Sequence, residues 1–290
     1  MEKIYKELCS KIKNADAVLI GASNGLSISE GLHLFADNEA FEELFGDMKA
    51  NYGVRNIFHG MTAVWPSETE KWRFISRLLN RYCVQYQPSV LMKNLKKIIG
   101  EKDYFILTSN GECHFEMSGF NPEKIWEIEG TWLNMQCAHR CHDTLYPTLE
   151  LAEKIVQAER NGMDLQELVP VCPRCKGAMQ IHMQTDYFFI PNHTQKENYQ
   201  TFLRKYHGKN LVVLELGIGW RNQLIKAPLM RLVADEPNAT YITINLGEVY
   251  IPDNIKEKSF GLDGYLNDIL TTMSTEMDIL NKSCKDDCNG

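Results

Sequence analysis

The chain has 290 residues, of which 44% are hydrophobic and 24% are charged, and its formal net charge is -7. This length suffices for one large α/β domain with an inserted module, or for two modest domains, and for a well-buried core. The net negative charge makes nucleic acid an unfavourable partner. No stretch approaches the roughly 20 apolar residues that span a bilayer, and the N-terminus lacks the apolar core of a signal peptide. We therefore expect a cytoplasmic protein without a membrane partner.

The N-terminal segment predicts the opening of a βαβ unit. Residues 2 to 14 alternate charged and apolar positions as an amphipathic helix does, and ADAVLIGASNGLS then indicates a short buried strand that enters a glycine-containing loop. Backbone N–H groups in such a loop, at the start of a helix, can approach a pyrophosphate. The spacing is not G-x-G-x-x-G, so an ordinary tight turn between strand and helix explains this loop about as well.

The rest of the chain predicts a parallel sheet with helices on both faces. Residues 38 to 99 show helical periodicity with interleaved aromatic residues and no convincing strand. Four further apolar runs follow: DYFILTSN, KIWEIEG, NLVVLELGIG and ATYITINLG. Runs of this kind that alternate with helices are typical of a Rossmann-like α/β domain, whose ligands bind beyond the carboxyl ends of the strands. We assign residues 1–130 and 189–280, with the helical segment 38–99, to this domain.

Cysteine spacing predicts a structural zinc site. Nine cysteines, an odd number, argue against a disulfide framework in a chain without an export signal. Cys137 and Cys141 form a C-x3-C pair, Cys172 and Cys175 form a C-x2-C pair, and this layout resembles the two knuckles of a zinc ribbon. We therefore predict one Zn²⁺ ion in an inserted module, residues 131–188. His139 and His142 crowd the first knuckle and could substitute as ligands, although four cysteines suffice.

Other cysteines point to packing rather than chemistry. Cys9, Cys83 and Cys113 are scattered, and we expect them to be small buried hydrophobic residues. The C-terminal residues 281–290 hold two more cysteines in a polar sequence, which predicts a disordered tail.

Taken in order, the motifs resemble the sirtuin (Sir2) family of NAD-consuming enzymes. The matching elements are GASNGLSISEGL (21–32), TSNGE (108–112), EIEG (127–130), the two cysteine pairs, GIGW (217–220), IN (244–245) and LDGY (262–265). The resemblance extends from about residue 16 to residue 270. It implies an enzyme that uses NAD as a substrate and holds a structural zinc ion.

The resemblance also implies roles for individual residues. It places Ala22, Ser23, Gly25 and Ser27 in the diphosphate loop, Asn110 and Glu112 beside the nicotinamide and its ribose, Gly217 and Gly219 in a second phosphate-side loop, and Asn245 at the adenosine ribose. Phe35 is the only residue kept from the Pro-Asp-Phe-Arg segment that usually follows the first loop, and it could equally be a core residue. Trp126, Trp132 and Trp220 are expected to pack rather than to stack on a ligand.

Several departures from the family bear on the reaction. Sirtuin deacylases usually carry a histidine where this chain has Glu129, and an aspartate where it has Glu112. Such departures resemble the macrodomain-linked sirtuins of microbes, in which glutamine typically replaces the histidine and the activity is protein ADP-ribosylation. The resemblance thus implies a protein acceptor, for which the branch suggests a lipoylated carrier protein. Glu129 departs even from this branch.

Glu129 has a chemical and a structural interpretation. A carboxylate can accept a proton and can stabilise the oxocarbenium-like state that forms when nicotinamide leaves NAD. Glu129 could instead be a turn residue paired with a lysine or arginine, and Asn110 could be a simple turn or cap residue. Three functions stay open: a protein ADP-ribosyltransferase, a deacylase that uses Glu129 as its base, and a catalytically silent protein that binds NAD or ADP-ribose.

Overall fold

The computed structural model describes residues 2–287, and its larger lobe is built on a six-stranded parallel sheet. The strand order is β3-β2-β1-β7-β8-β9, and every neighbouring pair is parallel. The strands are β1 (Ala17–Ala22), β2 (Asp103–Thr108), β3 (Ile125–Glu127), β7 (Leu211–Leu216), β8 (Thr240–Asn245) and β9 (Ser259–Asp263). The predicted Rossmann-like α/β fold is confirmed, and five of the strands coincide with the predicted apolar runs.

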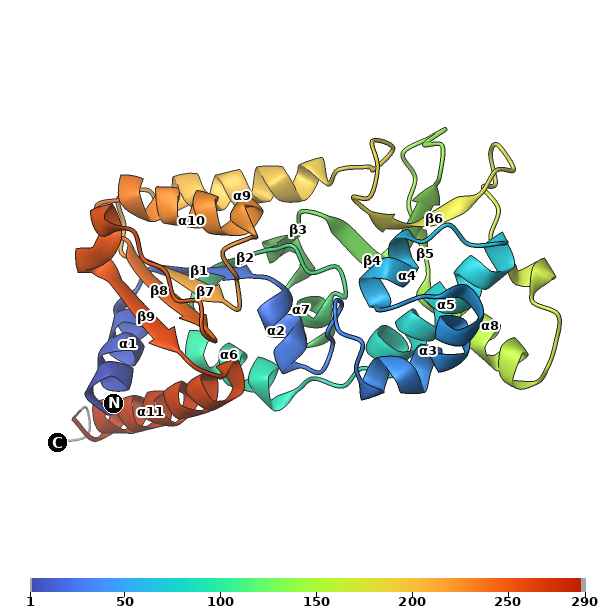
Figure 1. Ribbon diagram of the computed structural model, residues 1–290. Helices are drawn as coiled ribbons and strands as arrows, with labels where there is room; N and C mark the ends of the chain where they lie inside the picture. Colours follow the sequence, from blue (N-terminus) through green and yellow to red (C-terminus); the bar gives the residue numbers. More distant parts are fainter. Residues whose placement is uncertain (1, 288–290) are drawn as a thin grey trace.

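Helices cover both faces of this sheet (Figure 1). The helices α1 (Glu2–Asn14), α6 (Val90–Ile99) and α11 (Leu266–Asp287) lie on one face, and α9 (His193–Lys205) and α10 (Gln223–Asp235) lie on the other. Leu8 and Ile12, one turn apart on α1, are fully buried against the sheet, as the amphipathic pattern predicts. The described helix α11 includes residues 281–287, which were predicted as a polar tail, whereas residues 288–290 lie outside the described part of the chain.

A smaller lobe combines the predicted zinc module with most of the helical segment. Its antiparallel sheet has the order β5-β4-β6, with β4 (Gly130–Cys137), β5 (Tyr146–Pro147) and β6 (Met179–Met183). Around it lie α3 (Glu39–Tyr52), α4 (Ile57–Thr62), α5 (Glu68–Leu79), the π-helix η1 (Asn80–Val84) and α8 (Leu149–Arg160). One hydrophobic cluster joins these elements. The segment 38–99 therefore divides, because only α6 packs in the larger lobe.

Short helices complete the described chain. They are α2 (Asn24–Ser29), α7 (His114–Met117) and the 3-10 helices η2 (Pro122–Lys124), η3 (Gln166–Leu168) and η4 (Asp253–Lys258). The two that matter for the site are α2 and α7, since each directly follows the carboxyl end of a strand or its loop.

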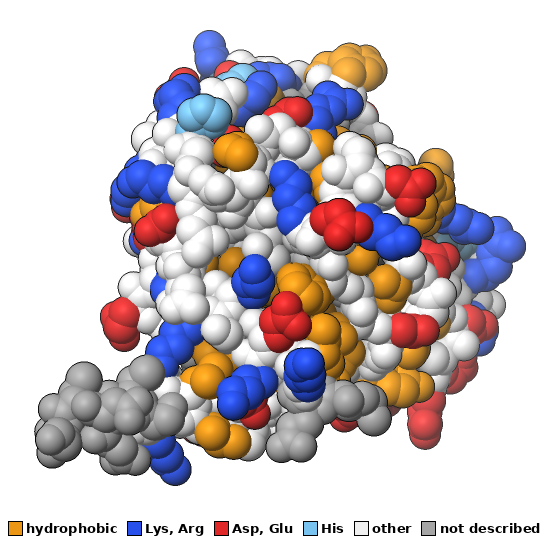
Figure 2. Space-filling view, turned by 90° about the vertical axis from the view of Figure 1, so that its left-hand side faces the viewer, with side chains coloured by type: hydrophobic (Ala, Val, Ile, Leu, Met, Phe, Trp, Pro, Cys, Tyr) orange, Lys and Arg blue, Asp and Glu red, His pale blue; other side chains and the backbone are white. Residues whose placement is uncertain are grey.

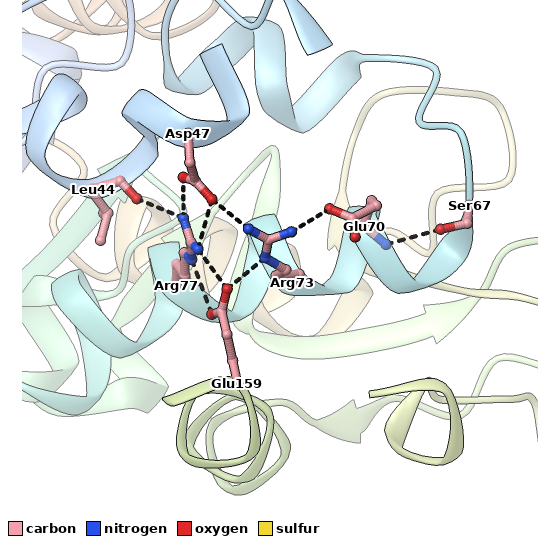
Figure 3. Close-up of polar contacts among 7 residues, drawn as sticks. All are labelled: Leu44, Asp47, Ser67, Glu70, Arg73, Arg77 and Glu159. Carbon is pink, nitrogen blue, oxygen red and sulfur yellow. Dashed lines mark hydrogen bonds and ion pairs between the residues drawn. The ribbon is translucent and has the colours of Figure 1, made fainter. Parts of the chain in front are cut away.

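Ion pairs fasten three helices of the smaller lobe to one another (Figure 3). Arg73 and Arg77 on α5 both contact Asp47 on α3 and Glu159 on α8, and Arg77 Nη1 lies 2.6 Å from Asp47 Oδ1. Burial alone would raise the pKa of Glu159, but its hydrogen bonds to the two arginines outweigh burial and lower that pKa. The network ties the zinc-bearing region to the helical segment.

We expect Glu159→Gln to lower the free energy of unfolding by about 1–2 kcal/mol at neutral pH, because two partly buried guanidinium groups lose a charged partner. The lowered pKa means that this contribution is present above the ordinary glutamate pKa and is lost as the pH falls through the native-state value. Denaturant unfolding of both proteins measures the effect. Glu153→Gln, at an exposed position on the same helix, is the matched control. Equal losses in the two variants would contradict a stabilising network.

The surface at the end of the larger lobe carries charges of both signs (Figure 2). Lysine and arginine side chains alternate there with aspartate and glutamate, so this face presents no extended field of one sign. Within residues 2–287, no helix has the length and apolar character needed to cross a membrane.

Candidate active site and zinc site

Four cysteines converge in the smaller lobe with the geometry of a zinc site. The Sγ atoms of Cys137, Cys141, Cys172 and Cys175 all lie within 4.8 Å of one another. The Cys137–Cys175 and Cys141–Cys172 sulfur pairs are separated by 3.6 and 3.5 Å. Zn–S bonds of about 2.3 Å in a tetrahedron place sulfur atoms roughly 3.8 Å apart. The predicted cysteine set thus fits one structural zinc ion.

The backbone conformation of both knuckles favours metal binding by the cysteines. Arg140, just before Cys141, and Lys176, just after Cys175, adopt positive φ angles of 45° and 61°. Backbone N–H groups of Cys175 and Arg174 lower the pKa of the Cys172 thiol to about 6, which favours the thiolate that zinc binds. His142 Nε2 lies 3.6 Å from Cys172 Sγ and also contacts the hydroxyl of Tyr146, so it supports a ligand from outside the sulfur cluster.

In the larger lobe, two glycine loops meet where β1 and β7 end. Gly25 N donates to Gly217 O over 2.9 Å, and a Cβ atom on Gly25 would lie only 2.6 Å from Gly217 Cα. Gly217 also has a positive φ of 62°. Only glycines allow this approach, because any side chain at either position would force the two backbones apart. The contact fixes the loops that form the floor of the candidate site.

Asn222, which follows the second loop, holds three strand ends together. Its Nδ2 atom donates to Ser23 Oγ over 2.7 Å and to Ser109 Oγ over 2.8 Å. The two serines follow β1 and β2, and they also contact each other. Asn222 and Ser109 were not among the predicted site residues, although both lie in glycine- and asparagine-bearing segments after predicted strands.

The largest cavity of the site lies along these strand ends and has a volume of about 1110 Å³. Its lining includes the predicted residues Ser23, Gly25, Phe35, Glu129, Gly217, Gly219 and Asn245. The lining also includes residues that were not predicted, among them His33, Arg221, Asn222 and Glu248. A cavity beside the carboxyl ends of β1, β7 and β8 is where this fold class binds dinucleotides.

A second cavity, of about 390 Å³, adjoins the first between the two lobes. Asn24, Phe35 and Glu129 line both cavities, so the two meet at these side chains. Its other walls include Asn110, Trp132 and the segment Met183–Thr185. Glu129 therefore stands at the junction of the large cavity and the smaller one.

Asn110, which lines this second cavity, has a side-chain acceptor without a hydrogen-bond partner among the described residues. Its backbone N–H donates to Thr108 Oγ1 and its Nδ2 donates to the carbonyl oxygen of Ser23, at 3.0 and 3.2 Å. Its Oδ1 atom is buried and has no partner within the described residues. Because an unsatisfied buried acceptor costs about 1–3 kcal/mol, this atom is well suited to receive a hydrogen bond from a ligand.

Glu129 is half-buried, and no ion pair of the described residues includes it. Its backbone oxygen accepts the N–H of Gln184 over 2.9 Å, which fixes the turn, while its side chain faces both cavities. Burial raises the pKa of its carboxyl above the ordinary value. The structure thus gives no support to the alternative in which Glu129 pairs with a lysine or arginine.

Three predicted site residues lie beneath the cavities rather than on their walls. Ala22 is fully buried, and Ser27 Oγ donates to Glu112 Oε1 over 2.5 Å in a buried contact. Burial raises the pKa of Glu112. Ser27 and Glu112 thereby join α2 to the loop that carries Asn110, so they position the site from below.

Glu30, at the end of α2, and His114, at the start of α7, form a second buried pair. His114 Nδ1 lies 2.9 Å from Glu30 Oε2, its Nε2 contacts the carbonyl oxygen of Tyr82, and Tyr86 stacks on its ring. Burial by itself lowers the pKa of His114, but the hydrogen bond to Glu30 and the charges of Glu112 and Glu30 outweigh burial and raise that pKa. His114 is therefore a buried link between α2 and α7 and does not reach either cavity.

Of the aromatic residues considered in the sequence, some pack against other side chains and some line the cavities. Phe35 is 49% exposed and contacts Phe58, so it is not a core residue. Trp132 is buried and lines the second cavity, Trp126 packs on Tyr199, and Trp220 packs edge-on against Tyr250. The remaining predicted hydrophobic cysteines, Cys9, Cys83 and Cys113, are buried as expected.

The parallel sheet, the zinc-bearing lobe and the cavity between them define the sirtuin fold. A sirtuin solved to study substrate affinity aligns with a TM-score of 0.61 and 14% identity, over 93% of this chain and 98% of that chain. A Sir2 homologue in complex with ADP-ribose aligns with a TM-score of 0.60 and 11% identity, over 95% of this chain and 97% of that one. The resemblance found in the sequence is confirmed by these structures at the level of the fold.

Two proteins with assigned activities are similar in sequence. A protein ADP-ribosyltransferase of Staphylococcus aureus is 28% identical over 273 residues, which cover 91% of this chain and 85% of that protein. A probable bifunctional ADP-ribose hydrolase/ADP-ribosyltransferase of Fusarium oxysporum f. sp. cubense is 28% identical over 225 residues, or 72% of this chain and 36% of that protein. No protein-family model matches the chain.

Proposed function

We propose that the chain is an NAD-dependent protein ADP-ribosyltransferase of the sirtuin type. The observation that carries the proposal is the meeting of Asn110 and Glu129 at one cavity, since the first has an unsatisfied acceptor and the second an unpaired carboxylate. The similarity to the staphylococcal ADP-ribosyltransferase supports the same reaction. The cytoplasmic location expected from the sequence remains part of this proposal.

The proposed reaction breaks the bond between the nicotinamide nitrogen and C1′ of the ribose, and the bonding electrons leave with nicotinamide. A lone pair of the acceptor side chain forms the new bond to C1′. Asn110 would orient the nicotinamide end through its free Oδ1 atom, which can accept an amide or hydroxyl hydrogen. Glu129 would stabilise the positive charge on the ribose and would take the proton that the acceptor loses.

Zinc has no place in these steps. The sulfur cluster has four protein ligands, which close a tetrahedral site and leave no position for a substrate. Its contribution is to hold the smaller lobe, and with it Trp132 and the segment Met183–Thr185, against the cavity.

The acceptor is a protein in this proposal, and a lipoylated carrier protein, which the sequence resemblance suggests, is the first one to test. Incubation with labelled NAD, a lipoylated carrier protein and an acylated peptide separates the three functions. Label on a protein supports the proposal. Acyl-ADP-ribose in solution would identify a deacylase instead, and neither product, with NAD bound, would identify a silent binding protein.

We expect Asn110→Ala to slow turnover by about 10² to 10³ and to weaken NAD binding much less, because one positioned polar group acts mainly as the bond breaks. Calorimetry with NAD and a single-turnover transfer assay give the two quantities. Asn161→Ala, at an exposed site after α8, is the control. A loss of binding as large as the loss of rate would show that Asn110 only binds the dinucleotide.

A further inference from the structure

We infer that Arg221 is the side chain that neutralises the diphosphate of the bound dinucleotide. The inference deepens the proposed function and rests on it. Among the described residues that line the large cavity, Arg221 is the only lysine or arginine, whereas Glu129 and Glu248 place two carboxylates there. A dianionic diphosphate in such a cavity needs a cation, and a guanidinium supplies parallel N–H donors that match phosphate oxygens.

Arg221 sits on a backbone that is fixed on both sides. The backbone N–H of Trp220 donates to Glu248 Oε2 over 3.0 Å. On the other side, Asn222 Nδ2 donates to Ser23 and Ser109 across the strand ends. The loop between β7 and α10 is therefore held over the diphosphate loop after β1, with Arg221 at the wall of the cavity. Because the neighbouring residues already hold the loop, binding of a phosphate by Arg221 does not have to order its backbone.

Arg221 is also available for a ligand. No ion pair within residues 2–287 includes it, and its side chain is exposed at the cavity wall. The neighbouring cation Lys226 is fully buried and paired with Glu215, so it cannot serve instead. His33, the other basic residue of the lining, already accepts the backbone N–H of Phe35 through Nδ1.

The backbone at the strand ends supplies less positive charge and fewer free N–H donors for an anion than the sequence predicts. The helix α2 that follows the first loop has only 6 residues, so its dipole is small. Gly25 N already donates to Gly217 O. These two facts leave the guanidinium of Arg221 as the strongest source of positive charge at the cavity.

Calorimetry with ADP-ribose and with adenosine tests the inference. We expect Arg221→Gln to weaken ADP-ribose binding about tenfold and to leave adenosine binding unchanged, since only ADP-ribose carries the diphosphate. The salt dependence of ADP-ribose affinity should fall at the same time. Arg221→Lys should recover part of the affinity, because it restores the charge without the forked geometry.

Arg231→Gln, at an exposed position on the outer side of α10, is the matched control and should bind both ligands as the unchanged protein does. Equal ADP-ribose affinities of Arg221→Gln and the unchanged protein would overturn the inference and leave the proposed function standing. An equal loss for adenosine would also overturn it, because the substitution would then have disturbed the whole cavity. If the unchanged protein bound neither ADP-ribose nor NAD at millimolar concentration, the proposed function itself would fail.

Discussion

Glu129→Gln is expected to bind NAD almost as well as the unchanged protein and to transfer ADP-ribose about 10² to 10⁴ times more slowly. Glutamine keeps the shape of the side chain and its position at the junction of the two cavities, while it removes the negative charge and the ability to accept a proton. The measurements are NAD affinity by calorimetry and a transfer assay with the same acceptor.

The control is Glu123→Gln, which alters an exposed carboxylate near the start of β3, at the opposite end of that strand from Glu129. It should transfer at the normal rate. Unchanged transfer by Glu129→Gln would make the carboxylate dispensable and would favour a role confined to the turn. We also expect that Glu129→His does not produce an efficient deacylase, since the segment 33–36 lacks most of the residues found in deacylases.

Acid pH should imitate this substitution. In the proposed reaction the ionised form of Glu129 is the active one, and burial raises the pKa of this carboxyl. Transfer should therefore be complete above that pKa and should be lost on acidification at a higher pH than an ordinary glutamate, with a pKa of about 4.3, would allow. A pH–rate profile under conditions where the fold is intact gives the midpoint.

Glu127 is the neighbour that could confuse such a profile, because burial raises its pKa to about 7. It lies two residues before Glu129 and lines neither of the two cavities of the site. The acid limb should remain in Glu127→Gln and should disappear from the residual activity of Glu129→Gln. The reverse result would assign the titration to Glu127 and would contradict the proposed role of Glu129.

The sequence predicted the central sheet well because its strands are buried on both faces. Continuous apolar runs such as NLVVLELGIG arise where helices cover a parallel sheet, and β7 is buried along its whole length. The edge strand β9 escaped prediction since its residues are partly exposed and Gly261 interrupts the run. The pairing of β9 with β8 is a tertiary contact, which no local pattern encodes.

The sequence predicted where in the chain the site residues lie better than it predicted which way their side chains point. Glycines and asparagines after buried strands indicated the cavity, but a motif does not say which side chains face it. Ser27 and Glu112 face each other below the floor, whereas Asn222 and Arg221 reach the site from a loop that the motif match covered only in part. A tally of charges in the cavity requires the fold, so the shortage of cations could not be seen in the sequence.

The composition of the smaller lobe was the least predictable feature. Asp47 and Glu159 are more than 100 residues apart in the chain, yet the same two arginines bind both. Helical periodicity in residues 38–99 shows that helices form there, and it does not show against which sheet they pack. The zinc-bearing region supplies the apolar surface that α3 to α5 require.

Because the zinc-bearing region shares this core with α3 to α5, loss of the metal should affect the whole smaller lobe. We expect Cys172→Ser to abolish stoichiometric zinc binding and to unfold the smaller lobe, because a metal held by four thiolates supplies much of the free energy of folding of such a module. The backbone donors that lower the pKa of the Cys172 thiol have no comparable effect on a serine hydroxyl, which stays protonated and binds zinc poorly. Metal analysis and protease sensitivity of residues 131–188 measure the two effects.

His139→Ala is the matched control, since His139 lies beside the first knuckle and no described metal cluster includes it. It should keep one zinc ion per chain. Loss of the lobe should also remove Trp132 and the segment Met183–Thr185 from the second cavity, so Cys172→Ser should lose transfer activity more completely than it loses affinity for ADP-ribose. The large cavity is lined mainly by residues of the larger lobe, whose sheet has its own core on both faces. A Cys172→Ser protein that retained full transfer activity without zinc would show that the sulfur cluster is not needed to shape the site.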